Sequence, residues 1–537
     1  MKRSVQFPIL FFISTFIFLC GAKNTLNSFP PQNLSPTWEN ANQLGLIYPE
    51  DLNNDFHNIE LIRSEYRNLN SSREELDWDN AAHLLRRTTI GPTLEEIEQA
   101  VSLGLDGTLD LLLESRPLPP PPDDWIYHPI SPDFNLFTAA QKDSIRDGWR
   151  DHFVGMAGWW LNLIYDSEIS IREIMTLFWH DHFATSGQVV KFTPSMYIQN
   201  QMLRKYATGN FKDLVKSINY DPAMLQWLDN DQNYFVSEAN QTINENYARE
   251  LLELFSMGEG NYSQFDIEEA ARALTGFSTD GINTFYSPTR HDHGNKQFIG
   301  FTGDFNADDI VDIVFEQSEP AIFLCTKLYK WFVYAIPDEE IIAEMASILV
   351  ENDFEIEPVL RALLSSDHFF DENFRGAKYK NPVWFTLGTF RQLYTTDDFR
   401  HEFILWYNLT LGEQLFYPPD VSGWDGYRSW VNTYTLPYRK LFTNQVIDGH
   451  GNLFPEWDGV ISFVERFSDP YNPETLLREF AEYFYAVQPS EQTMELLLEE
   501  LLDGSEIYDW DLYAMGSEQR LTDVIKHMMR LEEFQLR

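Results

Sequence analysis

Two short segments of this sequence each hold a pair of histidines on either side of an aspartate. The first segment, FWHDHFAT, carries His180 and His182 two residues apart. The second, RHDHGNKQFIG, repeats that spacing with His291 and His293. Imidazoles beside carboxylates are the usual components of metal sites and acid–base sites, because the neutral ring binds metals and the ring titrates near neutral pH. Both segments are therefore candidates for chemistry.

The expected backbone around each pair decides whether the pair can chelate an ion. In a helix, residues two apart point about 200° away from each other, so His180 and His182 cannot hold one ion unless the helix ends between them. His182 also shares the apolar stripe of its helix, which favours a core histidine bonded to the backbone or to a carboxylate. The other pair lies in a loop entering an extended strand, where residues two apart share a side. His291 and His293 have the better chelating geometry, although a solvated loop also explains them.

A third polar segment, NENYARELLELFSMG at residues 244–258, opens a helix. Asn244 suits the N-cap position, because its amide oxygen can accept a hydrogen bond from a first-turn N–H group. Glu245 suits the positive end of the helix dipole. A second helix start is predicted where Ser170 and Glu173 form a capping box ahead of the first histidine pair.

The helix of residues 244–258 carries a polar ridge opposite its apolar stripe. Asn246, Glu250 and Glu253 fall within a narrow arc, with Arg249 beside them. A solvated helix face explains such a ridge. If the ridge is buried instead, the two glutamates would repel each other, and one would need a cation or a raised pKa. The ridge is therefore a candidate source of the third ligand for a metal held by the second histidine segment.

These segments give two sets of candidate residues. The candidate catalytic residues are His180, His182, Arg249, Glu250 and Lys296, and the candidate metal ligands are Asn246, Glu253, His291 and Asp292. In this scheme Arg249 or Lys296 holds an anionic substrate, and the imidazoles and carboxylates act as ligands or acid–base groups. The cofactor that the scheme implies is a divalent metal.

Other familiar catalytic patterns are missing from the sequence. It has no GxSxG, HExxH, GxxxxGK[ST] or GxGxxG motif. The sequence therefore does not support its assignment to the serine hydrolases, zincins, P-loop proteins or dinucleotide-binding proteins that carry these motifs. The segment GDFNADDIVDIVFEQ is not a calcium loop, because Asp309 and Phe315 stand where that loop needs glycine and glutamate. Its acidic residues are better explained as the cap of a helix that begins near Asp309.

Helical periodicity dominates the elements that must position these residues. Apolar residues recur at three- and four-residue spacing across residues 76–444 and again across 445–537, as in ETLLREFAEYFYAV and EQTMELLLEELL. There is no internal repeat and no series of alternating strands. The sequence predicts a mainly α fold, with a multi-helix globular core over residues 76–444, a few short strands or extended loops, and a C-terminal helical region over 445–537.

The first 22 residues have the pattern of a signal peptide. A basic start precedes an apolar run, Phe7–Leu19, and the small residues Gly21 and Ala22 follow it. The run of 13 residues is shorter than the roughly 20 that a membrane-spanning helix needs, so cleavage of residues 1–22 is favoured over a transmembrane anchor. Lipidation at Cys20 is the alternative, ranked second because the residue before it is bulky.

The protein is therefore expected in the periplasm, on the outer cell surface or in the medium. Residues 23–75, rich in asparagine, proline and serine, are predicted to be flexible. Simple cleavage would leave Cys325 as the single thiol, which excludes an internal disulfide, and its apolar neighbours predict that it is buried. A formal charge of −44 would repel nucleic acid, so nucleic-acid binding is not expected.

Seven segments, in a fixed order, resemble a known family. They are AAHLLRRTTIGPT (81–93), TLFWHDHFATS (176–186), QNQMLRKYATGNFKDLVKSINYDPAMLQWLDN (199–230), NENYARELLELFSMG (244–258), ARALTGF (271–277), HDHGNKQFIG (291–300) and LGEQLFYPPDVSGWDGYRSW (411–430). Together they cover roughly residues 76–444. They resemble the bacterial family catalogued as "domain of unknown function 1800".

The resemblance implies an exported helical protein, often encoded beside a second uncharacterised family similar to sulfatase-like proteins, which is the implied partner. The family pattern is matched at His180, His182, Asn244, Glu245, Asn246, Arg249, Glu250, Glu253, Arg272, His291, Asp292 and Lys296. His293 stands at a position that the family leaves open, and Asp181 stands where asparagine is common. The resemblance also favours a buried polar network over a solvated ridge for residues 244–253.

Two functions of different classes fit these features. The first is an exported enzyme, with metal-assisted hydrolysis as the first reaction class to consider. The second is a non-catalytic binding or scaffold protein of the cell envelope, in which the same polar residues hold helices together and the acidic surface meets a partner. The missing catalytic motifs favour the scaffold, whereas the clustered histidine, glutamate and arginine residues favour the enzyme.

Overall fold

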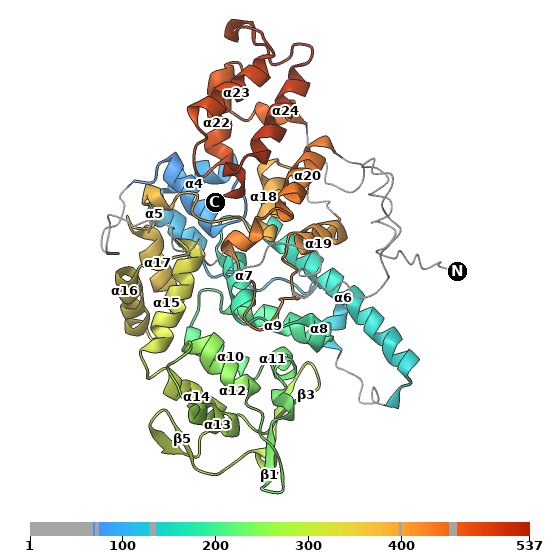
Figure 1. The fold of residues 1–537 in the computed structure, drawn as a ribbon, viewed down its shortest axis with the longest axis vertical. Coiled ribbons are helices and arrows are strands. Elements are labelled where there is room, and N and C mark those ends of the chain that lie inside the picture. The colour runs from blue at the N-terminus through green and yellow to red at the C-terminus, as the bar shows by residue number, and fades with distance from the viewer. Residues whose placement is uncertain (1–67, 70–74, 129–135, 397–399, 450–458) are drawn as a thin grey trace. The chain divides into compact units, whose positions relative to one another are not determined.

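The computed structural model describes residues 68–69, 75–128, 136–396, 400–449 and 459–537. Helices dominate this part of the chain, and its strands form three separate two-stranded antiparallel sheets (Figure 1). The predicted mainly α fold is therefore confirmed. The predicted signal peptide, and all of residues 23–75 except 68, 69 and 75, lie outside the described residues. No helix among the described residues combines the length and the apolar character needed to cross a bilayer.

The first group of helices includes α7 (Arg172–His182). The others in this group are α4 (Trp78–Thr88), α5 (Leu94–Leu113), α6 (Ala139–Tyr165), α8 (Gly187–Val190), α9 (Thr193–Lys205), α10 (Phe211–Ile218) and α11 (Pro222–Trp227). Helices α6 and α9 pack against α7, and every residue of α7 from Glu173 to His180 is buried. Capping boxes start α5, at Thr93 and Glu96, and α6, at Thr138 and Gln141.

The capping box predicted at Ser170 and Glu173 is wrong. Helix α7 begins at Arg172, and its N-cap residue, Ile171, makes no side-chain cap. The Ser170 hydroxyl accepts a hydrogen bond from the Arg172 N–H at 3.3 Å. The Glu173 side chain instead turns into the core, where it pairs with Arg204 of α9 at 2.8 Å. A charge-assisted pair is stronger than a neutral cap, and this explains why the tertiary contact wins.

The middle of the chain combines helices with the three hairpins. Its helical elements are α12 (Asn246–Glu250), a π-helical segment (Leu251–Ser256), α13 (Gln264–Ala273), α14 (Ala307–Val314), α15 (Glu319–Phe332), α16 (Glu339–Glu351) and α17 (Ile356–Ser365). The hairpins are β1 (Tyr234–Ser237) with β2 (Asn240–Thr242), β3 (Phe277–Thr279) with β4 (Thr284–Tyr286), and β5 (Lys296–Phe298) with β6 (Phe301–Gly303). The β5 strand packs against α13.

Two local predictions in this region are confirmed. Asn306 and Asp309 form a capping box that starts α14 at Ala307, two residues before the expected start. Cys325, on α15, is a buried free thiol within the hydrophobic core. The acidic stretch therefore begins a helix, as the sequence indicates.

The last helices are α18 (Pro382–Gln392), α19 (His401–Thr410), α20 (Thr435–Asp448), α21 (Val460–Val464), α22 (Pro473–Phe484), α23 (Glu491–Leu502) and α24 (Ser517–Arg530). Helices α22, α23 and α24 pack in sequence, as Figure 1 shows, and α24 also packs against α20. Helix α20 runs across residues 444 and 445, where the sequence suggested a boundary. The division of the chain into a core over residues 76–444 and a C-terminal region over residues 445–537 stays a prediction.

The final residues return to the start of α18. The Arg537 N–H donates to the Lys378 carbonyl at 2.8 Å, and the Lys380 N–H donates to the Gln535 carbonyl at 2.9 Å. Phe534 and Arg537 are buried there. The loop before α5 also meets α18 at very short range, because a Cβ atom on Gly91 would lie 2.6 Å from the Gly388 carbonyl oxygen. Backbone contacts therefore hold distant parts of the chain together at α18.

Candidate metal centre

The β5–β6 hairpin brings three potential metal ligands together. His291 and His293 precede β5, and Asp304 follows β6. The hairpin pairs Lys296 with Gly303, so the residues on either side of its open end are neighbours in space. Among the described residues, His291, His293 and Asp304 form a group whose ligand atoms all lie within 4.8 Å of one another.

The three side chains differ in exposure. His291 is buried, whereas the His293 side chain is 59% exposed and that of Asp304 is 46% exposed. The His293 Nδ1 atom lies 3.4 Å from the Asp304 Oδ2 atom, and the two imidazole ring centres are 4.9 Å apart. The group therefore combines one ligand anchored in the core with two that face solvent, which leaves one side open.

Neighbouring groups orient the three ligands. The Nδ1 atom of His291 lies 3.1 Å from the Thr275 carbonyl oxygen, and the Nε2 atom of His293 lies 3.0 Å from the Pro288 carbonyl oxygen. A carbonyl only accepts, so each of these nitrogens carries a proton, and in the neutral ring the other nitrogen keeps its lone pair. Metal-binding histidines characteristically donate their second nitrogen in this way.

Lys296 supports the third ligand. Its side chain is fully buried, and its ammonium group donates to the Asp292 carbonyl and, at 3.1 Å, to the Asp304 Oδ1 atom. Oδ2 of Asp304 is thereby left on the side of His293. Burial lowers the pKa of Lys296, and the neighbouring Asp304 opposes that shift. Lys296 was predicted to hold an anionic substrate, but its ammonium group already lies against chain oxygens.

Asp292, a predicted metal ligand, contacts an arginine instead. Its carboxylate receives two hydrogen bonds from Arg272, at 2.7 Å and 3.3 Å, and Arg272 also pairs with Glu269 at 2.8 Å. Burial opposes ionisation of Asp292, but the hydrogen bonds from Arg272 and from the Gly294 N–H outweigh it and hold the pKa below its ordinary value. Asp292 therefore ties the loop to α13.

His180 and His182 lie in separate environments on α7. His180 accepts a hydrogen bond from the Phe416 N–H at 3.0 Å through Nε2. The Nε2 atom of His182 lies 3.1 Å from the Phe255 carbonyl oxygen, and its Nδ1 atom lies 2.9 Å from the Lys327 ammonium nitrogen. Burial lowers the pKa of His180 to about 3 and also lowers that of His182. The two rings share no partner, as their helical spacing predicts.

Arg249 is the residue of the polar ridge that ties α12 to another helix among the described residues. The Asn244 side chain accepts from the Asn246 N–H at 2.9 Å, but the N-cap position of α12 is held by Glu245, which makes no side-chain cap, and not by Asn244 as predicted. Asn246 itself is exposed. Arg249 donates to Glu245 at 3.1 Å and to Gln264 of α13 at 3.0 Å. Asn246 and Arg249 thus lie in contacts of α12 that do not include the metal ligands.

The two ridge glutamates lie partly buried at the start of the π-helical segment. Burial, and then the neighbouring Glu253, raises the pKa of Glu250. Glu253 accepts a hydrogen bond from the Tyr262 hydroxyl at 3.2 Å. Glu253 is not a member of the His291 group, so the third ligand found there is Asp304 and not a ridge residue. The raised pKa of Glu250 shows the predicted repulsion between the two glutamates. Neither glutamate belongs to the group of metal ligands formed by His291, His293 and Asp304.

The sequence analysis missed Asp304 as a partner of the histidines. Asp304 was considered only within the calcium-loop pattern. The register that places it opposite the histidines depends on a hairpin turn at Ile299 and Gly300, both with positive φ. In the sequence QFIGFTGD, a turn glycine separates two short segments that each contain a phenylalanine. This hairpin pattern could have predicted that β5 pairs with β6 and brings Asp304 near the histidines.

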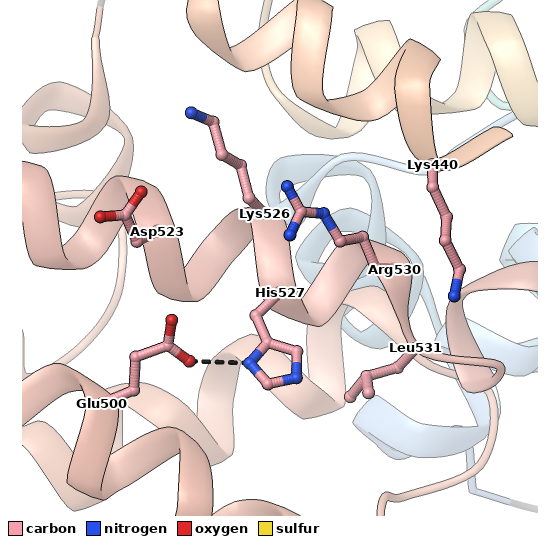
Figure 2. Close-up of a pocket in the computed structure, with 7 residues that line it drawn as sticks. All are labelled: Lys440, Glu500, Asp523, Lys526, His527, Arg530 and Leu531. Carbon is pink, nitrogen blue, oxygen red and sulfur yellow. Dashed lines mark hydrogen bonds and ion pairs between the residues drawn. The ribbon is translucent and has the colours of Figure 1, made fainter. Parts of the chain in front are cut away.

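A surface pocket lies elsewhere, between α20, α23 and α24 (Figure 2). Its volume is about 430 Å³, and its lining residues are Lys440, Glu500, Asp523, Lys526, His527, Arg530 and Leu531. His527 pairs with Glu500 at 2.7 Å, and Lys526 pairs with Asp448. The pocket contains none of the residues predicted for the site, and much of its charge is already paired, so we do not assign the site to it.

Comparison with known proteins adds one match. The model of a family described as "Protein of unknown function (DUF1800)" matches residues 83–536. Searches of curated proteins and of solved structures gave no match. The matched region contains the candidate metal centre and extends past residue 444, where the resemblance seen in the sequence ends. The chain therefore belongs to the DUF1800 family.

Proposed function

We propose that this protein is an exported metal-dependent enzyme, a hydrolase, with His291, His293 and Asp304 as its metal ligands. The observation that carries the proposal is the hydrogen bonding around these ligands. Each imidazole gives one nitrogen to a backbone carbonyl and Asp304 gives one oxygen to Lys296, while ligand atoms of all three side chains lie within 4.8 Å of one another. Three protein ligands with an open fourth position are typical of catalytic zinc sites.

The exposure of the group supports a catalytic role over a structural one. Structural zinc sites are closed by four protein ligands, whereas this group offers three and faces solvent through His293 and Asp304. A bound divalent ion would polarise a carbonyl or phosphoryl oxygen and activate water. The chain contributes the anchored ring of His291, the carbonyls that orient both imidazoles, and the buried ammonium group that orients Asp304.

Export is supported by the N-terminal sequence. Its basic start, short apolar run and small residues up to Ala22 are typical of cleaved signal peptides. Cleavage would leave Cys325 as the single thiol of the mature chain, and an exported protein with one buried thiol is stabilised by packing and not by disulfides. The proposal therefore places the enzyme in the periplasm, on the cell surface or in the medium.

A non-catalytic envelope scaffold is the alternative, and the contacts of the predicted catalytic residues favour it. His180, His182 and Arg249 all bond to neighbouring chain groups that tie α7 and α12 to other elements. A scaffold would need no metal. Its partner would be of the sulfatase-like kind that the family resemblance implies.

Metal binding by the purified mature protein separates the two functions. We expect about one zinc ion per chain by elemental analysis, and hydrolysis of ester or phosphoester substrates that a chelator abolishes. His293→Ala and Asp304→Asn should weaken zinc binding by more than the roughly 10- to 100-fold that loss of an orienting partner costs. The His293 side chain is exposed, so His293→Ala should fold as the parent does. Asp304→Asn keeps an acceptor for the buried Lys296 ammonium group but removes its counter-charge, so circular dichroism must show that this variant is folded.

Two controls make the result specific to the proposed centre. His128→Ala removes another exposed histidine and should leave zinc binding unchanged. Glu250→Gln alters the ridge on α12 and should also leave it unchanged. Metal-free protein after refolding with zinc, or equal zinc affinity in the parent and in His293→Ala, would contradict the proposed centre and favour the scaffold.

A further inference from the structure

Five cationic side chains are buried in one region around the start of α18. They are Arg86, Arg87, Lys380, Arg439 and Arg537, each at most 8% exposed. Burial, and then the neighbouring Arg86, Arg439 and Arg537, lower the pKa of Lys380. Burial, and then Arg537, likewise lower the pKa of Arg87. Among the ion pairs of the described residues, none joins any of the five to a carboxylate within 4.0 Å.

Glu413 is the buried carboxyl group nearest to this cluster in electrostatic terms. It accepts hydrogen bonds from the Asn381 side chain at 3.1 Å and from the Val383 N–H at 3.0 Å. Burial raises the pKa of Glu413 to about 8, although Arg439 and Arg537 lower it. Asp79, which is largely exposed, also lies within electrostatic range of Arg86. These two carboxyl groups cannot balance five buried cations, and buried charge without a counter-charge is costly.

Backbone carbonyls satisfy part of the cluster. Arg86 donates to the Tyr483 carbonyl at 3.1 Å, Arg87 to the Val333 carbonyl at 2.8 Å, and Arg439 to the Lys380 carbonyl at 2.8 Å. The Nε groups of four arginines remain buried without a partner: Arg86, Arg87, Arg439 and Arg537. The Lys380 ammonium nitrogen lies 3.9 Å from the Phe534 ring centre and makes no hydrogen bond to any described residue. Donors are therefore in excess here.

A small cavity adjoins three of these cations. Arg86, Lys380 and Arg537 line it, together with the backbone of Gly91 and Gly388, and its volume is about 10 Å³. Trp384, Gln392 and Phe484 also contribute to its wall. A volume of this size holds about one water-sized particle. It is too small for a phosphate or sulfate group.

We propose that this cavity binds one monatomic anion, a halide such as chloride, between Arg86, Lys380 and Arg537. A water molecule would fit the space but would leave the excess positive charge unbalanced. A halide accepts hydrogen bonds from several donors at once and supplies the missing negative charge. Because the site joins α4, the start of α18 and the C-terminal residues, the bound anion stabilises the packing of these segments.

Thermal unfolding of the full-length mature protein tests this inference. The unfolding midpoint should rise with sodium chloride relative to sodium gluconate at the same ionic strength, because an anion that binds only the folded state stabilises it. Lys380→Met should abolish the difference between the two salts. Lys330→Met removes an exposed lysine on α15 and should keep the chloride response of the parent.

Bromide provides a second readout that does not depend on a variant that folds. Crystals of the parent protein grown in sodium bromide should give an anomalous scattering peak in the cavity beside the Lys380 ammonium group. Equal midpoints in chloride and gluconate would overturn the proposal and would instead indicate that Lys380 is neutral in the folded state. An empty cavity in the bromide crystals, or a chloride response that survives Lys380→Met, would also overturn it.

Discussion

Replacing Glu173 by glutamine should destabilise the protein far more than the loss of a helix cap would. The Glu173 side chain is 4% exposed, and that of Arg204 is fully buried. Arg204 donates to both carboxylate oxygens, at 2.8 Å and 2.9 Å, and the Trp160 indole N–H donates to the same carboxylate at 2.8 Å. Glutamine removes the negative charge while keeping the size of the side chain.

The magnitude follows from what remains in the core. Breaking a buried ion pair leaves an uncompensated charge and costs about 3–5 kcal/mol. Arg204 keeps a hydrogen bond to Asn200 at 2.7 Å and a position 5.1 Å from the Trp159 ring centre, so we expect the lower end, about 3 kcal/mol. A cap residue is worth about 1 kcal/mol. Glu173→Gln should therefore lower the free energy of unfolding much more if Glu173 is the buried partner of Arg204 than if it is part of a helix cap.

Urea denaturation of the parent, Glu173→Gln and Ser170→Ala measures this difference. Ser170 accepts one long hydrogen bond at 3.3 Å, so its variant should lose about 1 kcal/mol or less. The slope of the unfolding free energy with urea should stay the same in all three proteins, so that the midpoints can be compared. A Glu173→Gln loss no larger than that of Ser170→Ala would refute the account of a buried pair.

Three further predictions concern the loop beside α7 and the single core thiol. Burial raises the pKa of Asp181 from 3.8 to about 6, so the stability that this group gives is complete below pH 3.8 and is lost as the pH rises through 6. Asp181→Asn keeps the acceptor for the Trp424 N–H and should raise the urea midpoint at pH 8 but not at pH 4. A Cβ atom on Gly423 would lie 2.5 Å from the Asp181 carbonyl oxygen, so Gly423→Ala should cost clearly more stability than Gly504→Ala, which has a similar φ and open space. Cys325 should resist alkylation in the native protein and react only on unfolding, as peptide mass spectrometry can measure, because it is fully buried and burial raises its pKa.

Local patterns in the sequence predicted the fold well where a contact depends on neighbouring residues. The three- and four-residue spacing of apolar side chains predicts the helices, and the cap at Asn306 predicts the start of α14. Extended-chain spacing likewise placed His291 and His293 on one side of their loop. In each case the residues that contact one another are a few positions apart in the sequence. Their spacing alone therefore predicts how they lie relative to one another.

The same reasoning failed where a distant partner decides the geometry. Glu173 is three residues from Ser170, as a capping box requires, but Arg204 on α9 forms the stronger contact. Asp304 approaches His293 only through the β5–β6 register. The π-helical turn at Leu251–Ser256 was also unforeseen, and π-helical segments are rare enough that a regular helix is the natural expectation.

The π-helical segment supplies a backbone acceptor for His182 of α7. The last carbonyls of a helix lack partners within it, and here those of Leu254 and Phe255 contact Lys327 at 3.2 Å and His182 at 3.1 Å. A metal ligand must keep one nitrogen lone pair free of protein donors. His182 uses both nitrogens in protein contacts, whereas His291 and His293 each place one nitrogen beside a backbone carbonyl, and the second nitrogen of His293 lies 3.4 Å from Asp304. Hydrogen bonding, more than residue type, therefore separates the helix-stabilising histidines from the candidate ligands.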